Sequence, residues 1–260
     1  MKPDIHIFLR KSFLSTIFLL FSTSALAGQS SYEGVVGWGQ QRTITAGVSG
    51  VVEKIGYSLG REFDQGETLI ALDQRPFDTQ VITQREVFSA ASLAFQESEK
   101  AHGRNQELFD EGSMALVEMD QADLTLAKAR ANYEIANASL AGAKYRKALA
   151  SVKAPFDGVA IELFATTGEY VNATSSAPRL MSIARREHFT IRVNVSAEKM
   201  PGVEIGSDAN VAIAGLSIAG KITAIKYPQT EAPTSDYVIF VSFISANEQV
   251  VPGRIAMVSF

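Results

Sequence analysis

The chain has 260 residues, a formal net charge of −4 at pH 7 and no cysteine. A mildly acidic chain without a basic stripe is not suited to bind a phosphate backbone, so we expect no nucleic-acid partner. Disulfides are excluded, and the fold must be stabilised by apolar burial and backbone hydrogen bonding.

Few residue patterns in the chain point to catalysis. Its histidines are His6, His102 and His188, which lie far apart and lack metal-ligand spacing. The sequence has no GxSxG motif, no phosphate-binding glycine loop and no HExxH motif. We therefore predict no catalytic residue, no metal site and no cofactor, and we do not expect an enzyme.

The N-terminus has the three parts of a secretory signal. A basic start that ends at Lys11 is followed by an apolar run over 13–21, and small residues stand at Ala25 and Ala27. Such a run is short for a membrane span, and the small residues suit a signal peptidase. We predict a signal peptide over 1–27 and a periplasmic mature chain; the alternative is an uncleaved N-terminal anchor.

After a leading segment, 28–42, the chain contains a repeat whose two copies are far apart. Both copies are rich in β-branched residues and punctuated by glycine, which is typical of short strands joined by tight turns. Their shared register indicates one small β domain with an insertion at its middle, whereas two independent hairpins would not require it. The pairs stand at a constant separation of 108 residues and include Ala46 and Ala154, Gly50 and Gly158, Val51 and Val159, and Gly60 and Gly168.

The two copies, 43–75 and 151–185, resemble the halves of a lipoyl or biotinyl carrier domain. A carrier needs a lysine in the turn that ends its first half, because only an amine forms the amide to the cofactor. Pro76 stands at that place, and no lysine occurs between Lys54 and Lys100. The resemblance therefore implies the fold without the modification. We assign its turns to Gly50, Gly60, Gly158 and Gly168.

The inserted segment, 76–150, has the composition of helices, with many Ala, Glu, Gln and Leu and no proline after Pro76. Its second half shows two columns at seven-residue intervals, one of alanine and one of larger apolar residues, and its first half shows a matching aromatic column. Alanine lets two helices approach closely, and larger side chains fill the seam. The predicted seam includes Phe88, Phe95, Leu126, Ala129, Tyr133 and Ala136.

The two arms are separated by a break at 109–113, where Gly112 is expected to end one helix and Ser113 to cap the next. Arms of about 35 residues predict an antiparallel coiled-coil hairpin roughly 50 Å long. His102 falls in the seam near the open end. We interpret it as a polar residue that sets the register, and the alternative is a functional histidine.

The last part of the chain, 186–260, alternates apolar and polar residues over 190–195, 210–213 and 237–243, with glycines between the runs. This pattern predicts a small antiparallel sheet. Closing it as a β-barrel is the simplest way to leave no strand edge unpaired.

In this order, a split carrier-like domain, a helical hairpin and a barrel resemble the HlyD-like membrane fusion proteins, the periplasmic adaptor subunits of resistance-nodulation-division (RND) efflux pumps. The resemblance covers nearly all of the chain after 1–27. Larger members add a membrane-proximal domain, which we expect to be reduced or absent here, with 31–41 as its remnant or a leading tail. The motifs that carry the resemblance are Gly50-Val51-Val52, Lys153-Ala154-Pro155-Phe156-Asp157-Gly158 and Val251-Pro252-Gly253.

The resemblance also implies that the hairpin tip docks onto a TolC-type outer-membrane channel. The family's tip often carries Arg, then Leu four residues on, then Ser seven further. Arg104 and Leu108 match, but the third place is Ala115, and Ser113 lies two residues away. We assign the channel contacts to Arg104, Leu108, Gly112 and Ala115; the alternative for Leu108 is packing across the hairpin seam.

Taken together, the resemblance implies an elongated, mixed α+β, non-enzymatic adaptor. It would link an inner-membrane efflux transporter to a TolC-type channel and would self-associate into a closed ring. Two rival hypotheses are an adaptor of an ABC-type exporter and a standalone periplasmic binding protein, although the sequence has no apolar pocket signature.

Overall fold

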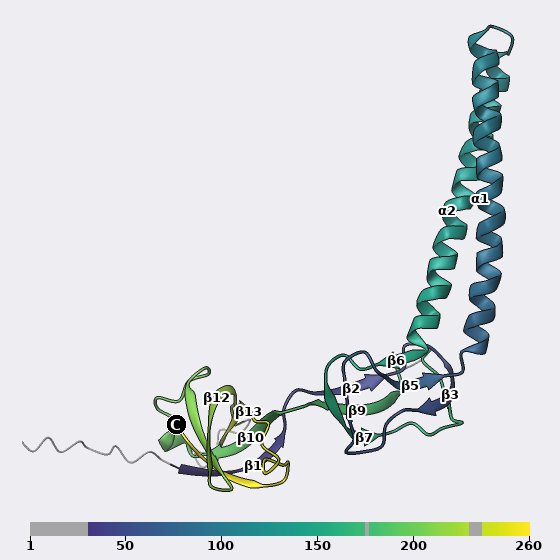
Figure 1. Ribbon diagram of the computed structural model, residues 1–260. Coiled ribbons are helices and arrows are strands. Elements are labelled where there is room, and N and C mark those ends of the chain that lie inside the picture. Colours follow the sequence, from purple (N-terminus) through teal and green to yellow (C-terminus); the bar gives the residue numbers. More distant parts are fainter. Residues whose placement is uncertain (1–30, 175–176, 229–235) are drawn as a thin grey trace, which may run out of the picture.

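The computed structural model describes residues 31–174, 177–228 and 236–260. The molecule is elongated and L-shaped: a β-barrel and a second β domain follow one another, and a two-helix arm rises from the far end of the second domain (Figure 1). The described part is mixed α+β, as the sequence predicts. The predicted signal peptide, 1–27, lies outside the described residues.

A closed antiparallel barrel forms one end of the molecule. Its strands are hydrogen-bonded in the order β1-β10-β13-β12-β11-β14, and β14 pairs back with β1, so the strand edges are paired. Inward and outward side chains alternate, and Ile191, Val193, Val211 and Val241 are fully buried. The elements are β1 Ser31–Trp38, β10 His188–Val195, β11 Asp208–Ile213, β12 Leu216–Lys226, β13 Tyr237–Ile244 and β14 Ile255–Ser259, with a 3₁₀ turn at Ala197–Lys199.

Strand β1 corrects one prediction. The segment expected to be a leading tail or the remnant of another domain is a barrel strand that pairs with both β10 and β14. Val36 is buried in the barrel core, and a Cβ on Gly34 would come within 2.4 Å of Ile191, so the strand can pack this closely only with glycine there. Trp38 stacks on Phe189. The sequence did not show this because both partner strands lie far along the chain.

The second β domain consists of two four-stranded sheets related by an internal twofold. One sheet has the order β2-β9-β7-β4 and the other the order β6-β5-β3-β8. The counterparts in the two copies are β2 and β6, β3 and β7, β4 and β8, and β5 and β9. Replacing each strand by its counterpart converts the order of one sheet into the order of the other. The strands are β2 Gln41–Thr45, β3 Gly50–Ile55, β4 Glu62–Phe63, β5 Thr68–Leu72, β6 Ser151–Lys153, β7 Gly158–Leu163, β8 Tyr170–Val171 and β9 Arg179–Arg185.

The twofold extends to individual backbone contacts. Strand β3 pairs with β5, and β7 with β9, with the same register shift at the corresponding place. The copies also exchange equivalent hydrogen bonds: the Gly60 N–H donates to the Ala160 carbonyl, and the Gly168 N–H donates to the Val52 carbonyl, both at 2.8 Å. The sequence repeat is therefore a repeat of backbone pairing within one domain, and two independent hairpins do not describe it.

The core of the second domain is sealed between its two sheets. Leu69, Ile70 and Leu72 from one copy and Leu180 and Ile183 from the other have no exposed surface. Burying one such side chain contributes about 1.5–3 kcal/mol, so this cluster gives the rest of the molecule a rigid base.

The two-helix arm is inserted between β5 and β6. Helix α1, Arg75–Asp110, has proline in its first turn, where the missing N–H would have no helical partner. Helix α2, Leu116–Leu149, returns antiparallel to it (Figure 1). Contacts between the helices include the Lys147–Asp78 ion pair at the base and the His102–Asp123 pair, 2.6 Å apart, towards the tip.

Candidate docking site on the helical arm

Helix α1 ends at the tip in a glycine-terminated turn. Gly112 has a φ of +71°, a backbone conformation that glycine adopts without a Cβ clash. The Gly112 N–H donates to the Phe109 carbonyl at 3.0 Å, and the Ser113 N–H donates to the Leu108 carbonyl at 2.8 Å. These two bonds form a Schellman motif, which satisfies carbonyl groups that the helix leaves free.

The start of helix α2 differs from the sequence expectation. Ser113 was expected to cap this helix, but the residue before the first helical turn is Ala115. Its backbone N–H donates to the Glu118 carboxylate at 3.2 Å, so the first turn supplies its own acceptor. The Schellman motif places Ser113 outside the helix, which is why it does not serve as the cap.

The assigned channel contacts all lie on the outside of the arm. Arg104, Gly112 and Ala115 are exposed, and Leu108 keeps 43% of its surface exposed. Arg104 and Leu108 are one helical turn apart on α1, so they share a face. The neighbouring Phe109, and not Leu108, is the partly buried residue of this turn.

Two further apolar residues at the tip were not assigned from the sequence. Leu116 is 62% exposed and Val117 is 77% exposed, in the first turn of α2. An exposed branched pair adds little to a helix, because its side chains gain no burial. The signal was present in the sequence, since neither residue belongs to the seven-residue columns that mark the seam.

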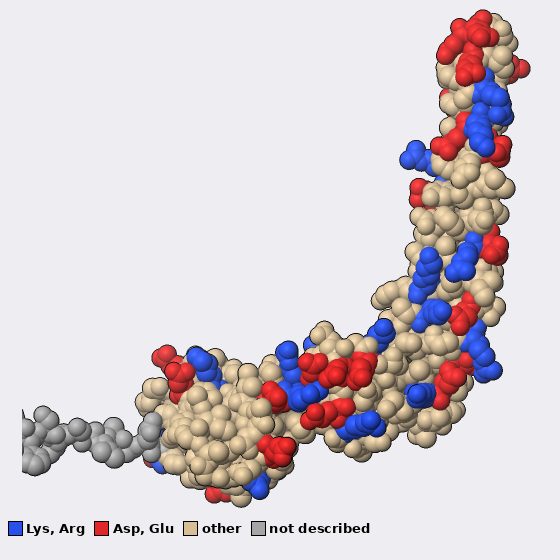
Figure 2. All heavy atoms as spheres, in the orientation of Figure 1, with Lys and Arg blue, Asp and Glu red and all other residues tan. Residues whose placement is uncertain are grey.

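Acidic side chains surround these apolar residues. Figure 2 shows red carboxylates over the end of the arm and blue side chains directly below them. Below the tip, Lys100 donates to Glu97 at 2.9 Å, and this hydrogen bond lowers the pKa of the Glu97 carboxyl. The tip is therefore an apolar surface with an acidic rim. The exposed carboxylates are those of Glu107, Asp110, Glu111, Glu118 and Asp120.

The residues assigned to the seam lie between the two helices. Phe88 and Phe95 approach the Tyr133 ring from α1, with ring centroids 5.4 and 5.5 Å apart. Ala136 is 4% exposed, while Leu126 and Ala129 are partly buried. Rings on α1 thus face small and aromatic residues on α2, which allows close helix packing.

The seam becomes polar towards the tip. His102 meets the Asp123 carboxylate across the helices at 2.6 Å, beside a hollow of about 190 Å³. No packed aromatic group fills this hollow, which is lined by Ser98, Ala101, His102, Asn105, Glu118, Gln121, Ala122 and Thr125.

The outer face of α2 carries a third apolar column at seven-residue intervals. Every member is exposed and none is charged, although the same face also carries Lys128 and Glu134 beside the column. The outer column consists of Val117, Leu124, Ala131, Ala138 and Tyr145.

Of the glycines assigned to the carrier-like turns, Gly60 and Gly168 lie in turns, whereas Gly50 and Gly158 are the first residues of strands β3 and β7. Gly60 and Gly168 have φ of +77° and +89°, so they supply the left-handed conformation that their turns need. Gly158 allows close approach, because a Cβ there would come within 2.5 Å of the Ala184 carbonyl oxygen. Gly50 has more space, since its nearest neighbour would be Leu72 at 3.5 Å.

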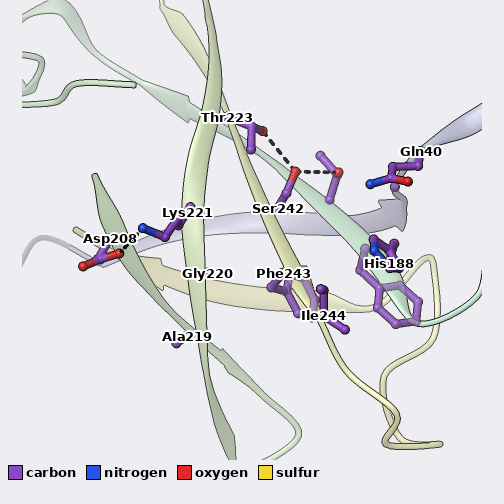
Figure 3. A pocket seen from close by; sticks show the side chains of 13 residues that line it. Gln40, His188, Asp208, Ala219, Gly220, Lys221, Thr223, Ser242, Phe243 and Ile244 are labelled. Atoms are coloured by element: carbon purple, nitrogen blue, oxygen red, sulfur yellow. Dashed lines mark hydrogen bonds and ion pairs between the residues drawn. The ribbon is translucent and has the colours of Figure 1, made fainter. Parts of the chain in front are cut away.

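The barrel wall has a shallow hollow of about 450 Å³ near the second domain. Figure 3 shows Ser242 and Thr223 among the residues that line it. The Ser242 hydroxyl lies 3.0 Å from that of Thr223 and 3.2 Å from that of Thr190. These hydroxyls bond one another, and the Nδ1 of His188, which also lines the hollow, lies 2.8 Å from the Arg186 carbonyl oxygen. Within the described residues, no group of three or more His, Asp or Glu is placed to hold a metal ion. In the described part of the chain, no helix is long and apolar enough to cross a bilayer.

Comparison with known proteins finds matches by structure and none by sequence. No protein-family model matches the chain, and a sequence comparison with curated proteins finds no match. The membrane fusion protein Spr0693 from Streptococcus pneumoniae has a similar structure, with a TM-score of 0.67 and 16% identity over 88% of this chain and 97% of that one.

Two further structures show the same similarity. A MacA–MexA chimera that contains the α-hairpin domain of Pseudomonas aeruginosa MexA has a TM-score of 0.64 and 17% identity, over 88% of this chain and 80% of that one. ZneB from Cupriavidus metallidurans has a TM-score of 0.52 and 19% identity, over 89% and 97%. The chain therefore has the fold of the membrane fusion proteins, as its sequence motifs predicted.

Proposed function

We propose that this chain is a non-enzymatic periplasmic adaptor that links an inner-membrane efflux transporter of the RND type to a TolC-type outer-membrane channel. The observation that supports this most directly is the exposed apolar tip, at the opposite end of the molecule from the closed barrel. A long body with an exposed apolar tip could contact one partner there while its barrel end rests on another. Its cargo would be drugs or other small molecules, which the transporter itself would carry.

In this proposal the arm is a coiled-coil spacer. Its helices contain 36 and 34 residues, which correspond to about 50 Å at 1.5 Å per residue. The rings of Phe95 and Tyr133 and the small side chain of Ala136 keep the helices close. The carrier-like domain holds the arm at its base, because the chain enters and leaves the arm directly from paired strands, β5 and β6.

The tip would provide the channel contact. Burial of Leu108, Leu116 or Val117 in a channel groove would each contribute up to about 1.5–3 kcal/mol. Arg104 would add a charge-assisted hydrogen bond to a carboxylate or carbonyl of the channel. The acidic rim around the apolar residues would favour a basic edge on the partner.

Self-association into a ring is supported by the outer column of α2. An exposed column of apolar residues along a helix gains burial when a second copy packs against it. Exposed apolar residues also occur on α1, where Ile82 is 57% exposed and Leu93 is 60% exposed. Contact between the outer column of one copy and α1 of the next is head-to-tail, which is the type of contact that closes into a ring.

The barrel end would rest on the transporter at the periplasmic side of the inner membrane. The Arg104–Leu108 pair and the predicted signal over 1–27 favour an RND partner over an ABC-type exporter. The two alternatives differ in the gene beside this one, which would encode either a large multi-span pump or an ATP-binding subunit. Association with the transporter would hold the exported protein at the inner membrane.

The decisive experiment changes the tip without touching a packed residue. We expect Arg104→Asp to abolish drug tolerance that depends on efflux, because it places a carboxylate where the channel would accept a hydrogen bond. Protein level, melting temperature and co-purification with the transporter should remain unchanged. Lys128→Asp is the matched control, because it makes the same change of charge at an exposed site away from the tip.

The control should support full efflux. If Arg104→Asp also supports full efflux, the docking assignment at the tip is wrong. If both variants abolish efflux while the protein remains folded, the charge of the arm matters and the specific contact at Arg104 does not.

A further inference from the structure

Two chain segments join the barrel to the second β domain, and each contains one residue in a left-handed backbone conformation. Gln40, between β1 and β2, has a φ of +48°, and Glu187, between β9 and β10, has a φ of +63°. Such angles are uncommon for residues other than glycine, so surrounding contacts must hold them. The Ser245 N–H donates to the Glu187 carbonyl at 2.9 Å, which ties this segment to the barrel.

Arg186 ties the same segment to the second domain. Its Nη2 lies 2.9 Å from the Asp64 carboxylate and donates to the Phe63 carbonyl at 3.2 Å. Its Nε is 3.4 Å from the Glu62 carboxylate, without hydrogen-bond geometry, and has almost no exposed surface. The backbone N–H of Arg186 donates to the Asp157 carbonyl at 3.1 Å. The Arg186 side chain thus connects the segment between β9 and β10 to both residues of strand β4 and to Asp64, the residue that follows it.

The charge of this group is favoured by its surroundings. The hydrogen bond to Asp64 raises the pKa of the Arg186 guanidinium, and the nearby Glu62 carboxylate acts in the same direction. A planar guanidinium can bond a carboxylate and a backbone carbonyl at fixed angles, whereas the ammonium group of a lysine cannot bond them in the same geometry. The contact is therefore directional, which is the property required to set an angle between two domains.

The internal twofold of the second domain supplies a comparison within the same chain. Strand β9 leads out to the barrel as β5 leads out to the arm, and the residue that corresponds to Arg186 is Arg75. The Arg75 side chain is 88% exposed and binds only its neighbour Asp73. The residues that correspond to Glu62 and Asp64 are Tyr170 and Asn172, which carry no charge. The carrier-like fold therefore does not require this clamp, which is present only at the exit to the barrel.

We propose that Arg186 is a positioning residue that fixes the direction of the barrel relative to the second domain and its arm. Without Arg186, the barrel could rotate relative to the second domain about the segments that contain Gln40 and Glu187, while each domain would keep its own core. The proposal concerns the geometry of the chain alone, and it holds or fails whether or not the protein acts as an efflux adaptor.

The test measures the distance between the two domains in the purified full chain. Because the chain has no cysteine, Lys153→Cys on the second domain and Ala212→Cys on the barrel give a single pair of spin labels at exposed sites. We expect Arg186→Gln to broaden the distance distribution by about twofold, because a joint without its clamp samples more orientations. The melting temperature should not change, and Arg186→Lys should broaden the distribution less.

The matched control is Arg75→Gln, which removes the same charge from the corresponding residue and should leave the distribution unchanged. An unchanged width in Arg186→Gln, or equal broadening in Arg75→Gln, would overturn the proposal. If Arg186→Gln lowers the melting temperature, the double variant Glu62→Gln and Asp64→Asn replaces it and must itself broaden the distribution, or the proposal is wrong.

Discussion

The second β domain and the helical arm are parts of one continuous chain, yet they are stabilised in different ways. In the β domain, side chains from both sheets form a sealed core, and Leu69, Leu72 and Leu180 have no exposed surface. In the arm, two helices share one narrow seam, and each keeps an outward face. The few fully packed residues of the arm are Val81, Met119, Ala136, Leu140 and Ala143.

This difference leaves exposed apolar surface on the arm and almost none in the core of the β domain. A two-layer domain can bury both of its inner faces, whereas a two-helix hairpin can bury only one stripe of each helix. The apolar residues that remain outside, such as Leu116, Ile135 and Tyr145, are 62–66% exposed and gain nothing for the isolated fold. Their burial requires another molecule.

The largest expected effect tests the sealed core. Leu180→Ala should lower the free energy of unfolding by about 2–5 kcal/mol, because it removes a fully buried side chain and leaves a cavity. Leu124→Ala in the arm is the matched change at a residue 46% exposed, and it should cost about 0.5 kcal/mol or less. Urea denaturation measures both values. Equal losses would show that the outer column is already buried in the free protein.

A smaller effect tests the seam. Ala136→Leu should cost about 1–3 kcal/mol, because a larger side chain cannot fit where the helices approach closely. Ala129→Leu should cost less, since Ala129 is only partly buried. Lys128→Leu, on the exposed side of the same helix, should leave the melting temperature unchanged. If all three variants melt alike, the seam does not run through the alanine column.

The smallest expected effect concerns Asp73, which lies where the second β domain leads into the helical arm. Hydrogen bonds from the Arg75 side chain lower the pKa of the Asp73 carboxyl, with a second contribution from the Arg75 backbone N–H. A lowered pKa in the folded state means that the carboxylate stabilises the fold at neutral pH, and this stabilisation is lost as the pH falls through the folded-state pKa.

Asp73→Asn should therefore melt at a slightly lower temperature than the unchanged protein at pH 7. The difference should shrink as the pH falls below about 3.9, the ordinary pKa of aspartate. Thermal melts at several pH values measure it. A difference that grows on acidification would mean that the sign of the shift is wrong.

Much of the fold was predictable because it depends on local patterns. The glycines of the repeat, Gly60 and Gly168, mark turns whose left-handed angles favour glycine, and the alanine column marks a close helix approach. Gly112 likewise predicted the end of α1. In each case the residue type reflects a constraint that acts within a few residues.

The predictions that were wrong or incomplete concern the hairpin tip, where several residues compete for the same backbone groups. Ser113 is a good helix cap by type, but it belongs to the Schellman motif that ends α1 and lies two residues before Ala115, the residue that precedes α2. The Glu118 carboxylate accepts the Ala115 N–H instead. The exposed pair Leu116 and Val117 lies outside the seam columns, and its position at the tip became clear only when the first turn of α2 was placed.

The spacing of residue types along the chain was enough to predict the order of the parts, the register of the repeat and the polarity of the helix faces, because each of these depends on local patterns. The closure of the barrel by β1 depends on long-range contacts, since its partners β10 and β14 lie far along the chain and no local pattern identifies them. Long-range contacts also distinguish Arg186, which binds the residues of β4, from Arg75, which binds only its neighbour Asp73. The two arginines follow corresponding strands, and only the residues that β4 and β8 bring near them differ.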